Sequence, residues 1–514
     1  MKLDKVLYIF DPFALIEEHS WTIIKLCNKL SKSDWNVTLI SCDSGFKFCT
    51  VMDYQQLEPQ SSKIRKLQVC TLCKGTRETL NTFLDDRVKV DKIGKSTEVA
   101  DKIQLNERAY YEPVIKFKKT NMNINLNEQD WFLEASRTFA ISYKFFLEKM
   151  SRERPDALLV YSPQYAAGSG ASEAAQQLGI PTIFLEGSSS PVNRWASLRI
   201  WDWDKFGLVD PCANSEDYLN SRIRVLAFMH FKMLRKGLTH SAYSTPVQGK
   251  SIRSELLSEN KANKIVLAVL SSTDEVYSAQ SIGKFTSGRI SKNVYADQFQ
   301  WIQDLCQFVM EQNNITLVIR MHPRDFVVGP NGRASDASRN WLRISKDFFH
   351  LKNRIVWDFP SDGNSLYDLI GATDIVTTGW SSVAIETLFI GKPVVTFDEE
   401  LSGLPKTLTM TGNSRLKYFE NLLVALELGP SFKNTIKALK YISFRDFERT
   451  HKVGGMAYAN PYIVSQYTFK RLIIHLLNRL SSSNRNKLNS RLNSPRSKDT
   501  ISEAIIKILD SYIP

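Results

Sequence analysis

Apolar and polar positions along this chain form two recurring patterns. Short runs of four to six residues rich in Val, Ile and Leu are typical of buried strands, and longer segments with apolar residues every three or four positions are typical of helices. The two patterns alternate repeatedly, which predicts an α/β fold with parallel sheets. The strands are expected at residues 6–10, 37–41, 157–161, 181–185, 265–270, 315–320, 375–378 and 393–397.

The segments between the strands carry helical spacing. Before the strand at 375–378, Asn364 or Ser365 is placed to cap a short helix, and after it Ser381 and Ser382 open another helix that Gly391 closes. The expected helices are 20–30, 128–150, 168–178, 215–237, 366–372, 381–390, 416–428, 432–447 and 462–480.

A chain of 514 residues is long enough for two α/β domains, expected at 1–244 and 262–460. Residues 54–127 lack a clean period, so they are expected to form an irregular insertion in the first domain, which the helix at 215–237 closes. An amphipathic helix is expected at 461–480, followed at 481–514 by a basic tail and a terminal helix.

The composition, 43% hydrophobic and 24% charged, is typical of a globular protein. No apolar run approaches the roughly 18 residues of a membrane-spanning helix, and we expect a cytoplasmic protein. Seven cysteines are too few for a disulfide framework. Cys70 and Cys73 have the spacing of a metal pair but no second pair accompanies them, so no metal is expected there.

The net charge of +13 predicts anionic partners. No nucleic-acid-binding motif is present, so nucleic acid is not expected. The anionic inner face of the cell membrane fits the charge better, and an acidic glycan with its nucleotide donor is the remaining anionic partner.

Ser381 and Ser382 stand where a helix leaves a buried strand. A helix start presents unpaired N–H groups and a partial positive charge, so a phosphate would fit there. Glu386 lies near the same helix end and could bind ribose hydroxyls or a basic side chain. The alternative is that the serines only cap the helix and Glu386 is a solvated or ion-paired carboxylate.

His322 follows directly on the strand at 315–320. Ligands of open α/β sheets bind beyond the carboxyl ends of the strands, so His322 is expected at the same sheet edge as Ser381. Its imidazole could carry a proton at neutral pH and contact a phosphate, with Arg320 or Arg324 binding further oxygens. A structural histidine is the alternative.

Ser271 and Ser272 follow the strand at 265–270 and are secondary candidates at this edge. They could contact a phosphate bound at this edge, or they could be ordinary loop residues.

These motifs resemble the donor-binding half of GT-B glycosyltransferases that build bacterial capsule and surface polysaccharides. The most similar groups are the capsule-type Kdo transferases, the bacterial sialyltransferases and the CDP-glycerol glycerophosphotransferases. The resemblance covers residues 264–398 and implies two Rossmann-like domains facing a cleft, with the helix at 461–480 crossing back. The matching residues are His322, Pro323, Ser381, Ser382, Glu386, Gly391, Lys392 and Pro393.

The resemblance implies transfer of a sugar from a nucleotide-activated donor, a CMP-linked acidic sugar, to a polysaccharide or glycolipid acceptor without a cofactor. His322 and the helix start at Ser381 and Ser382 would stabilise the departing phosphate. Three alternatives stay open. They are a UDP-sugar 2-epimerase of the same fold, a CDP-glycerol-type glycerophosphotransferase, and an inactive scaffold in polysaccharide export.

In such a transferase, the first domain would supply the catalytic base. Glu186 ends a predicted strand and could accept the acceptor's proton, or it could cap the following turn. Asp11 and His19 are expected in the loop after the first strand as acceptor contacts, with helix capping or solvation as the alternative. The one Asp-x-Asp pair, Asp202 and Asp204, lies outside the donor half, so no metal is predicted.

Overall fold

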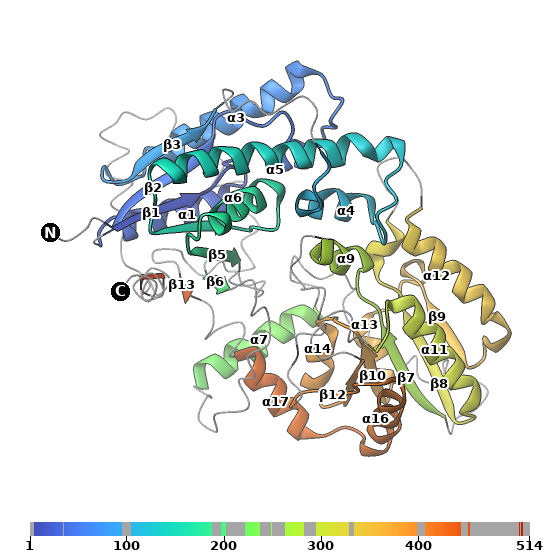
Figure 1. The fold of residues 1–514 in the computed structure, drawn as a ribbon. Helices are drawn as coiled ribbons and strands as arrows, with labels where there is room; N and C mark the ends of the chain where they lie inside the picture. The colour runs from blue at the N-terminus through green and yellow to red at the C-terminus, as the bar shows by residue number, and fades with distance from the viewer. Residues whose placement is uncertain are drawn as a thin grey trace. The chain divides into compact units, whose positions relative to one another are not determined.

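The computed structural model describes residues 5–33, 35–94, 104–187, 197–201, 221–236, 248, 263–281, 294–327, 334–397, 404, 407–443, 451–452, 503 and 505–506. The chain divides into two compact units (Figure 1). Unit 1 consists of Met1–Pro113, Asn123–Trp203 and Arg449–Pro514, and unit 2 consists of Val114–Met122 and Asp204–Glu448. Among the described helices, none is both long and apolar enough to cross a bilayer.

Unit 1 contains a seven-stranded sheet in the order β13-β6-β5-β4-β1-β2-β3. The strands from β3 to β5 run parallel, and β6 and β13 add antiparallel pairings at one edge. The strands are β1 (Lys5–Phe10), β2 (Trp35–Cys42), β3 (Lys89–Ile93), β4 (Ala157–Tyr161), β5 (Thr182–Gly187), β6 (Ser197–Trp201) and β13 (His451–Lys452).

Helices cover both faces of this sheet. On one face Leu7 and Ile9 of β1 pack with α1, and on the other Phe10 meets Phe146 of α5 edge to face at 4.8 Å. At the start of α5, two residues before the predicted start at 128, the Glu128 carboxylate accepts a hydrogen bond from the Asn125 N–H at 3.1 Å. The helices are α1 (Glu17–Leu30), α2 (Thr50–Tyr54), α3 (Lys63–Asn81), α4 (Tyr111–Phe117), α5 (Leu126–Arg152) and α6 (Ala166–Gln177).

Residues 54–127 contain regular structure, so their prediction as an irregular insertion is wrong. The segment supplies α3, a helix of 19 residues, and β3, which extends the parallel sheet beside β2. Near the end of the chain, β13 pairs with β6 and Ile505 is buried in the core of unit 1. The predicted helix at 461–480 and basic tail at 481–497 lie outside the described residues.

Unit 2 contains a six-stranded, fully parallel sheet in the order β12-β11-β10-β7-β8-β9. Strands β7 and β8 are mostly apolar, as expected of strands buried on both faces, and every residue of β8 is buried. The strands are β7 (Lys264–Val269), β8 (Ile315–Arg320), β9 (Ile355–Asp358), β10 (Ile375–Thr378), β11 (Val394–Thr396) and β12 (Met410–Thr411).

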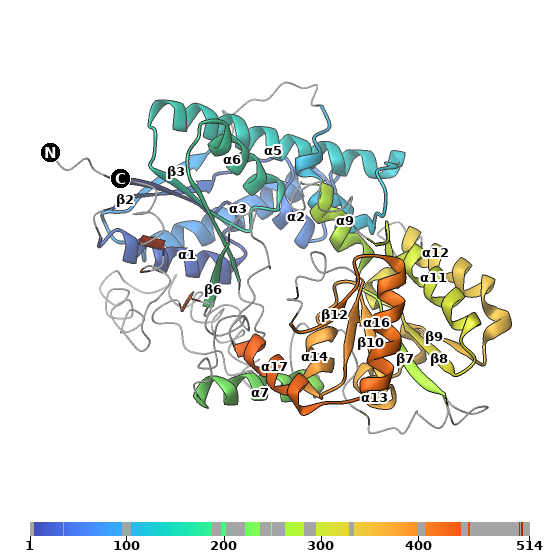
Figure 2. The same cartoon turned by 60° about the horizontal axis from the view of Figure 1, so that its bottom comes forward.

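Helices cover both faces of this sheet (Figure 2), and an apolar core lies on each face. Alternate residues of β7 enter them, with Leu267 in the core shared with α13, α14 and α17 and Val266 in the core shared with α11, α12 and α16. The helices are α7 (Ser221–Arg235), α9 (Thr273–Ser281), α11 (Gln298–Glu311), α12 (Asp336–Asp347), α13 (Leu366–Ala372), α14 (Val383–Phe389), α16 (Arg415–Leu428) and α17 (Phe432–Ile442).

Helix α7 corrects the expected end of the first domain. Its Ala227 and Phe231 are buried in the core of unit 2, and the Phe231 ring stacks on Phe389 of α14 with centroids 4.0 Å apart. The helix therefore belongs to unit 2, although we expected it to close the first domain.

Candidate functional site at the carboxyl edge of the second sheet

The strand order of unit 2 locates its candidate site. Chain order reverses between β7 and β10, which are hydrogen-bonded neighbours in the sheet although β8 and β9 lie between them in the chain. Open α/β sheets bind ligands outside the carboxyl ends of the strands at such a switch point. The loops after β7 and β10 flank it, and the loop after β8 lies one strand further.

The prediction that His322 and Ser381 share one sheet edge is confirmed by this topology. His322 follows β8 and Ser381 follows β10, and both strands run parallel to β7 between them. Two strand spacings amount to about 10 Å, which is within the reach of one nucleotide. Whether both residues contact the same ligand stays a prediction.

The loop after β7 is held rigidly by α11. Gln298 accepts a hydrogen bond from the Ser271 N–H at 2.9 Å and donates to the Ser271 carbonyl at 3.0 Å. The Ser271 hydroxyl is buried and has no hydrogen-bond partner among the described residues. A buried polar atom without a partner is uncommon and calls for an explanation, of which a missing ligand is one.

A second buried donor of this kind lies on the other side of the switch point. Trp380 follows β10, and its indole Nε1 is buried without a hydrogen-bond partner among the described residues. The side chain packs against the core on one face of the sheet. Sequence reasoning missed Trp380 because its place between Gly379 and Ser381 suggested only a turn.

Gly379 brings this turn close to the end of β11. A Cβ at Gly379 would stand 2.7 Å from Cζ of Phe397, which is less than any ordinary contact. The Phe397 ring is fixed in turn by Tyr295 and Trp301. Only glycine fits, and the position of Trp380 follows from that close approach.

The loop after β8 holds His322 as a neutral imidazole. The Arg324 N–H donates to His322 Nδ1 at 3.3 Å, which places the imidazole proton on Nε2. Burial, reinforced by the positive charges of Arg324 and Lys118, lowers the pKa of His322 to about 4. The expectation of a proton-carrying histidine at neutral pH is therefore wrong for the unliganded protein, and His322 presents an Nε2–H donor.

Asp274, in the first turn of α9, forms ion pairs with two cations beside this loop. Its Oδ2 accepts from Arg324 Nη2 and from Lys118 Nζ, each at 3.0 Å, while Oδ1 accepts from the Ser272 hydroxyl. The carboxylate is almost fully buried, so these contacts are poorly screened. Arg324 also pairs with Glu275.

No pattern in the sequence pointed to Lys118 as a cation of this site. It belongs to the short segment Val114–Met122 of unit 2 and lies 156 positions from Asp274 along the chain. Its backbone has φ 54°, a left-handed conformation that costs free energy in a residue with a β-carbon. Strained residues of this kind gather at functional sites.

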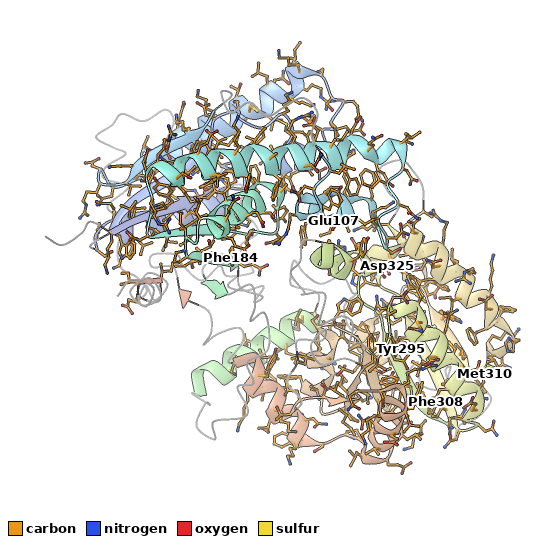
Figure 3. All side chains as sticks on the ribbon, in the orientation of Figure 1. Glu107, Phe184, Tyr295, Phe308, Met310 and Asp325 are labelled. Carbon is orange, nitrogen blue, oxygen red and sulfur yellow. The ribbon has the colours of Figure 1, made fainter. Side chains whose placement is uncertain are left out.

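Asp325 secures the start of α9 (Figure 3). Its carboxylate accepts from the N–H and the hydroxyl of Thr273, each at 3.2 Å, and from Trp341 Nε1 at 3.0 Å. Burial raises the pKa of Asp325 to about 6, against these three bonds. Asp325 therefore ties the loops after β7 and β8 together.

Ser381 and Glu386 have structural partners within unit 2. The Ser381 hydroxyl accepts from the Val383 N–H at 3.3 Å, which is the capping alternative, and Ser382 is exposed without a side-chain cap bond. Burial raises the pKa of Tyr367, and the charge of Glu386 and its hydrogen bond with Tyr367 raise that pKa further. Their binding of a phosphate or a ribose stays a prediction.

Two other residues of the predicted motifs have structural roles. Arg320 forms a buried ion pair with Asp358 of the neighbouring strand β9. The Asp358 carboxylate also accepts a hydrogen bond from the Asn364 side chain at 2.8 Å. Lys392 donates to the carbonyls of Ile370 at 2.6 Å and Gly371 at 2.7 Å and so caps the end of α13. Lys392 therefore lies at the end of a helix that leads away from the carboxyl edge.

In unit 1 the three predicted residues lie on different elements. Glu186 is the next-to-last residue of β5 and pairs with Arg199 of β6. The turn after Gly187 lies outside the described residues. Asp11 follows β1 but is buried in an ion pair with Arg77 at 2.6 Å, which attaches α3.

His19 corrects the expected loop. It lies in the first turn of α1, which begins three residues earlier than predicted, and its ring packs on Tyr161 with centroids 4.3 Å apart. The catalytic role of Glu186 and the acceptor roles of Asp11 and His19 stay predictions.

Within the described ranges, no cluster of three His, Cys, Asp or Glu side chains could hold a metal ion. Asp202 and Asp204 lie outside those ranges. Cys70 and Cys73 are free thiols on α3, and burial raises the pKa of Cys73.

Comparisons with known proteins give likenesses of fold. No protein-family model and no curated protein sequence matches the chain. A Thermosulfurimonas dismutans KpsC, a beta Kdo 2,4 transferase, is 15% identical, with 56% of this chain and 87% of that one covered and a TM-score of 0.31. A UDP-GlcNAc 2-epimerase of Methanocaldococcus jannaschii, solved with UDP-GlcNAc and UDP, is 12% identical, with coverages of 85% and 98% and a TM-score of 0.29.

A structure described as a UDP-N-acetylglucosamine 2-epimerase of Listeria monocytogenes is 12% identical, with coverages of 85% and 90% and a TM-score of 0.26. At such low identities and TM-scores these likenesses carry no argument about activity. The function has to be argued from the site.

Proposed function

We propose that this chain is a glycosyltransferase that takes a sugar from a nucleotide-activated donor bound at the carboxyl edge of unit 2. The observation that carries the proposal is the pair of buried donors without partners, Ser271 Oγ and Trp380 Nε1, in the two loops that flank the switch point. Two such groups at the position where this fold binds ligands are explained together if a polar ligand satisfies both.

Cationic and N–H groups beside the switch point could bind a phosphate. Arg324 and Lys118 are ion-paired with Asp274 and Glu275, so a phosphate would share these cations with the two carboxylates, and His322 supplies a neutral N–H donor. A donor phosphate can accept from these groups, and its negative charge would raise the pKa of His322 above its value in the unliganded protein. Ser382 and the backbone at the start of α14 are further candidate contacts.

In the proposed reaction, an acceptor hydroxyl oxygen forms a bond to the anomeric carbon of the sugar. The bond from that carbon to the donor phosphate oxygen breaks, and the nucleotide leaves with the electron pair. Glu186 accepts the hydroxyl proton, while His322 and the cations stabilise the leaving phosphate. We infer a CMP-linked acidic sugar as donor, a surface polysaccharide or glycolipid as acceptor, and no requirement for a metal.

A thermal-shift comparison of CMP, CDP, UDP and GDP tests the donor site. We expect one of the cytidine nucleotides to raise the melting temperature of the wild type, since a ligand that binds only the folded state stabilises it. Ser271→Ala and Trp380→Phe remove the two unpartnered groups. They should leave the unliganded protein at least as stable as wild type and weaken the nucleotide response.

Trp357→Phe is the matched control. Trp357 Nε1 is also buried without a partner among the described residues, but it lies on β9, two strands from β7. Its removal should not change the nucleotide response. If no nucleotide stabilises the wild type, or if all three variants respond equally, the donor site is wrong. Sugar conversion without an added acceptor would instead favour the epimerase.

A further inference from the structure

Helix α3 of unit 1 presents large apolar side chains to solvent. Ile64, Leu67 and Leu72 are 71%, 51% and 63% exposed. In the same helix Val69 and Leu80 are buried against the unit, so α3 is already fixed by its opposite side. The exposed apolar side chains therefore do not stabilise the fold, because apolar surface contributes to stability only when it is removed from water.

The exposed apolar residues form one stripe. At 100° per residue, Leu67, Ile64 and Leu72 fall within an arc of about 140° on the helix surface, on the side opposite the buried Val69 and Leu80. An outward stripe of this kind on a helix docked by its other face is typical of a surface that contacts a partner.

Basic residues border the stripe on both sides. Lys63 and Lys74 lie along one margin and Arg65 along the other, and all three are exposed. The helix carries five basic residues, of which Arg77 is buried in its ion pair with Asp11, and one acidic residue, Glu78, which lies at the angle of the stripe but six residues beyond Leu72. The exposed Lys74 ammonium is 3.3 Å from Asp43, an exposed pair of small energetic weight.

We propose that α3 docks this protein on the surface of an anionic lipid bilayer. Apolar side chains in the centre with cations along both margins are the arrangement by which an interfacial helix inserts its apolar face among acyl chains while its charges meet lipid phosphates. The charge complementarity favours a bilayer over a second copy of the chain, because two copies of α3 would bring like charges together.

Helix α16 of unit 2 offers a contrast within the same chain. It also exposes Leu416, Leu423 and Leu428, but Glu420 and Glu427 lie between them on its exposed side. Carboxylates within the stripe oppose contact with an anionic surface. Helix α16 therefore serves as a control, because its apolar exposure is similar but its exposed side carries carboxylates that an anionic surface repels.

The test is co-sedimentation of the full-length chain with vesicles of phosphatidylglycerol and phosphatidylcholine, and with vesicles of phosphatidylcholine alone. The wild type should bind the mixed vesicles, and the triple variant Ile64→Gln, Leu67→Gln, Leu72→Gln should bind at least about tenfold more weakly. Lys63→Gln and Arg65→Gln should each weaken binding by about fivefold, an effect that added salt reduces.

The matched control, Leu416→Gln, Leu423→Gln, Leu428→Gln, should bind as the wild type does. All substituted side chains are exposed, so melting temperatures should stay unchanged and report that each variant is folded. The proposal is overturned if the wild type does not bind mixed vesicles, if it binds neutral vesicles equally, or if both triple variants lose binding alike. A wild-type dimer that the α3 variant dissociates, with vesicle binding unchanged, would overturn it in favour of an interface between copies.

Discussion

Acidification should destabilise this protein through His322, because the folded chain holds its imidazole neutral. The pKa of His322 is lowered from 6.5 to about 4, first by burial and then by the charge of Arg324. Between these values the unfolded chain binds a proton that the folded chain does not, so stability falls as the pH falls. At about pH 5 the loss from this one group is about 2 kcal/mol relative to pH 7.5.

His322→Asn isolates this contribution. The asparagine amide oxygen can still accept from the Arg324 N–H, but the side chain no longer titrates. Asp325 acts in the opposite direction, since burial raises its pKa from 3.8 to about 6 and acidification then favours the folded state. Both proteins retain Asp325, so the difference between them reports His322.

Guanidinium unfolding at both pH values gives the comparison, with the unfolding of unit 2 followed by its tryptophans. The variant should lose about 2 kcal/mol less than the wild type on acidification. An NMR titration of ¹³C-labelled histidines, with the variant identifying the His322 signal, measures the pKa directly. Equal pH dependence in the two proteins, or a His322 pKa in the ordinary range, would refute a buried neutral imidazole.

Three further changes test contacts within the units, each by thermal and chemical unfolding. Lys392→Ala should cost about 2 kcal/mol because it leaves the carbonyls at the end of α13 without their cation, and Lys392→Arg should cost less; equal losses would count against the cap. Asp11→Ala should cost about 3–5 kcal/mol by isolating the buried Arg77, and Asp11→Leu with Arg77→Met should recover most of it. A loss typical of an exposed pair would contradict this. Gly379→Ala should cost about 1–3 kcal/mol through its clash with Phe397, and a second substitution, Phe397→Leu, should relieve it. An alanine variant as stable as wild type would show that the ring can move.

The sequence predicted the sheet edge of unit 2 because strong local patterns define it. The strand at Ile315–Arg320 is apolar except for Thr316 and Arg320, and Pro323 after it begins a short 3₁₀ helix. Parallel strands then place the residues that follow them on the same edge without any knowledge of side-chain contacts. For this reason His322 and Ser381 could be assigned to one edge from the pattern alone.

Other parts of the fold depend on information that a local pattern lacks. The apolar residues on both sides of α3 obscure its period, since Ile64 and Leu72 face away from the core that contains Leu80. The burial that keeps His322 neutral arises from packing, and the contact of Lys118 with Asp274 joins segments that are far apart in the chain. None of these leaves a periodic signal.

Lys118 belongs to Val114–Met122, a segment of unit 2 that is separated along the chain from the rest of that unit. The polypeptide passes between the units four times, after Pro113, Met122, Trp203 and Glu448. A fragment starting at Asp204 would lack the ammonium that meets Asp274, leaving Arg324 as that carboxylate's remaining cation. An exchange of unit 2 between related proteins, by recombination or in the laboratory, would therefore have to carry the nine residues Val114–Met122 along with the larger segment.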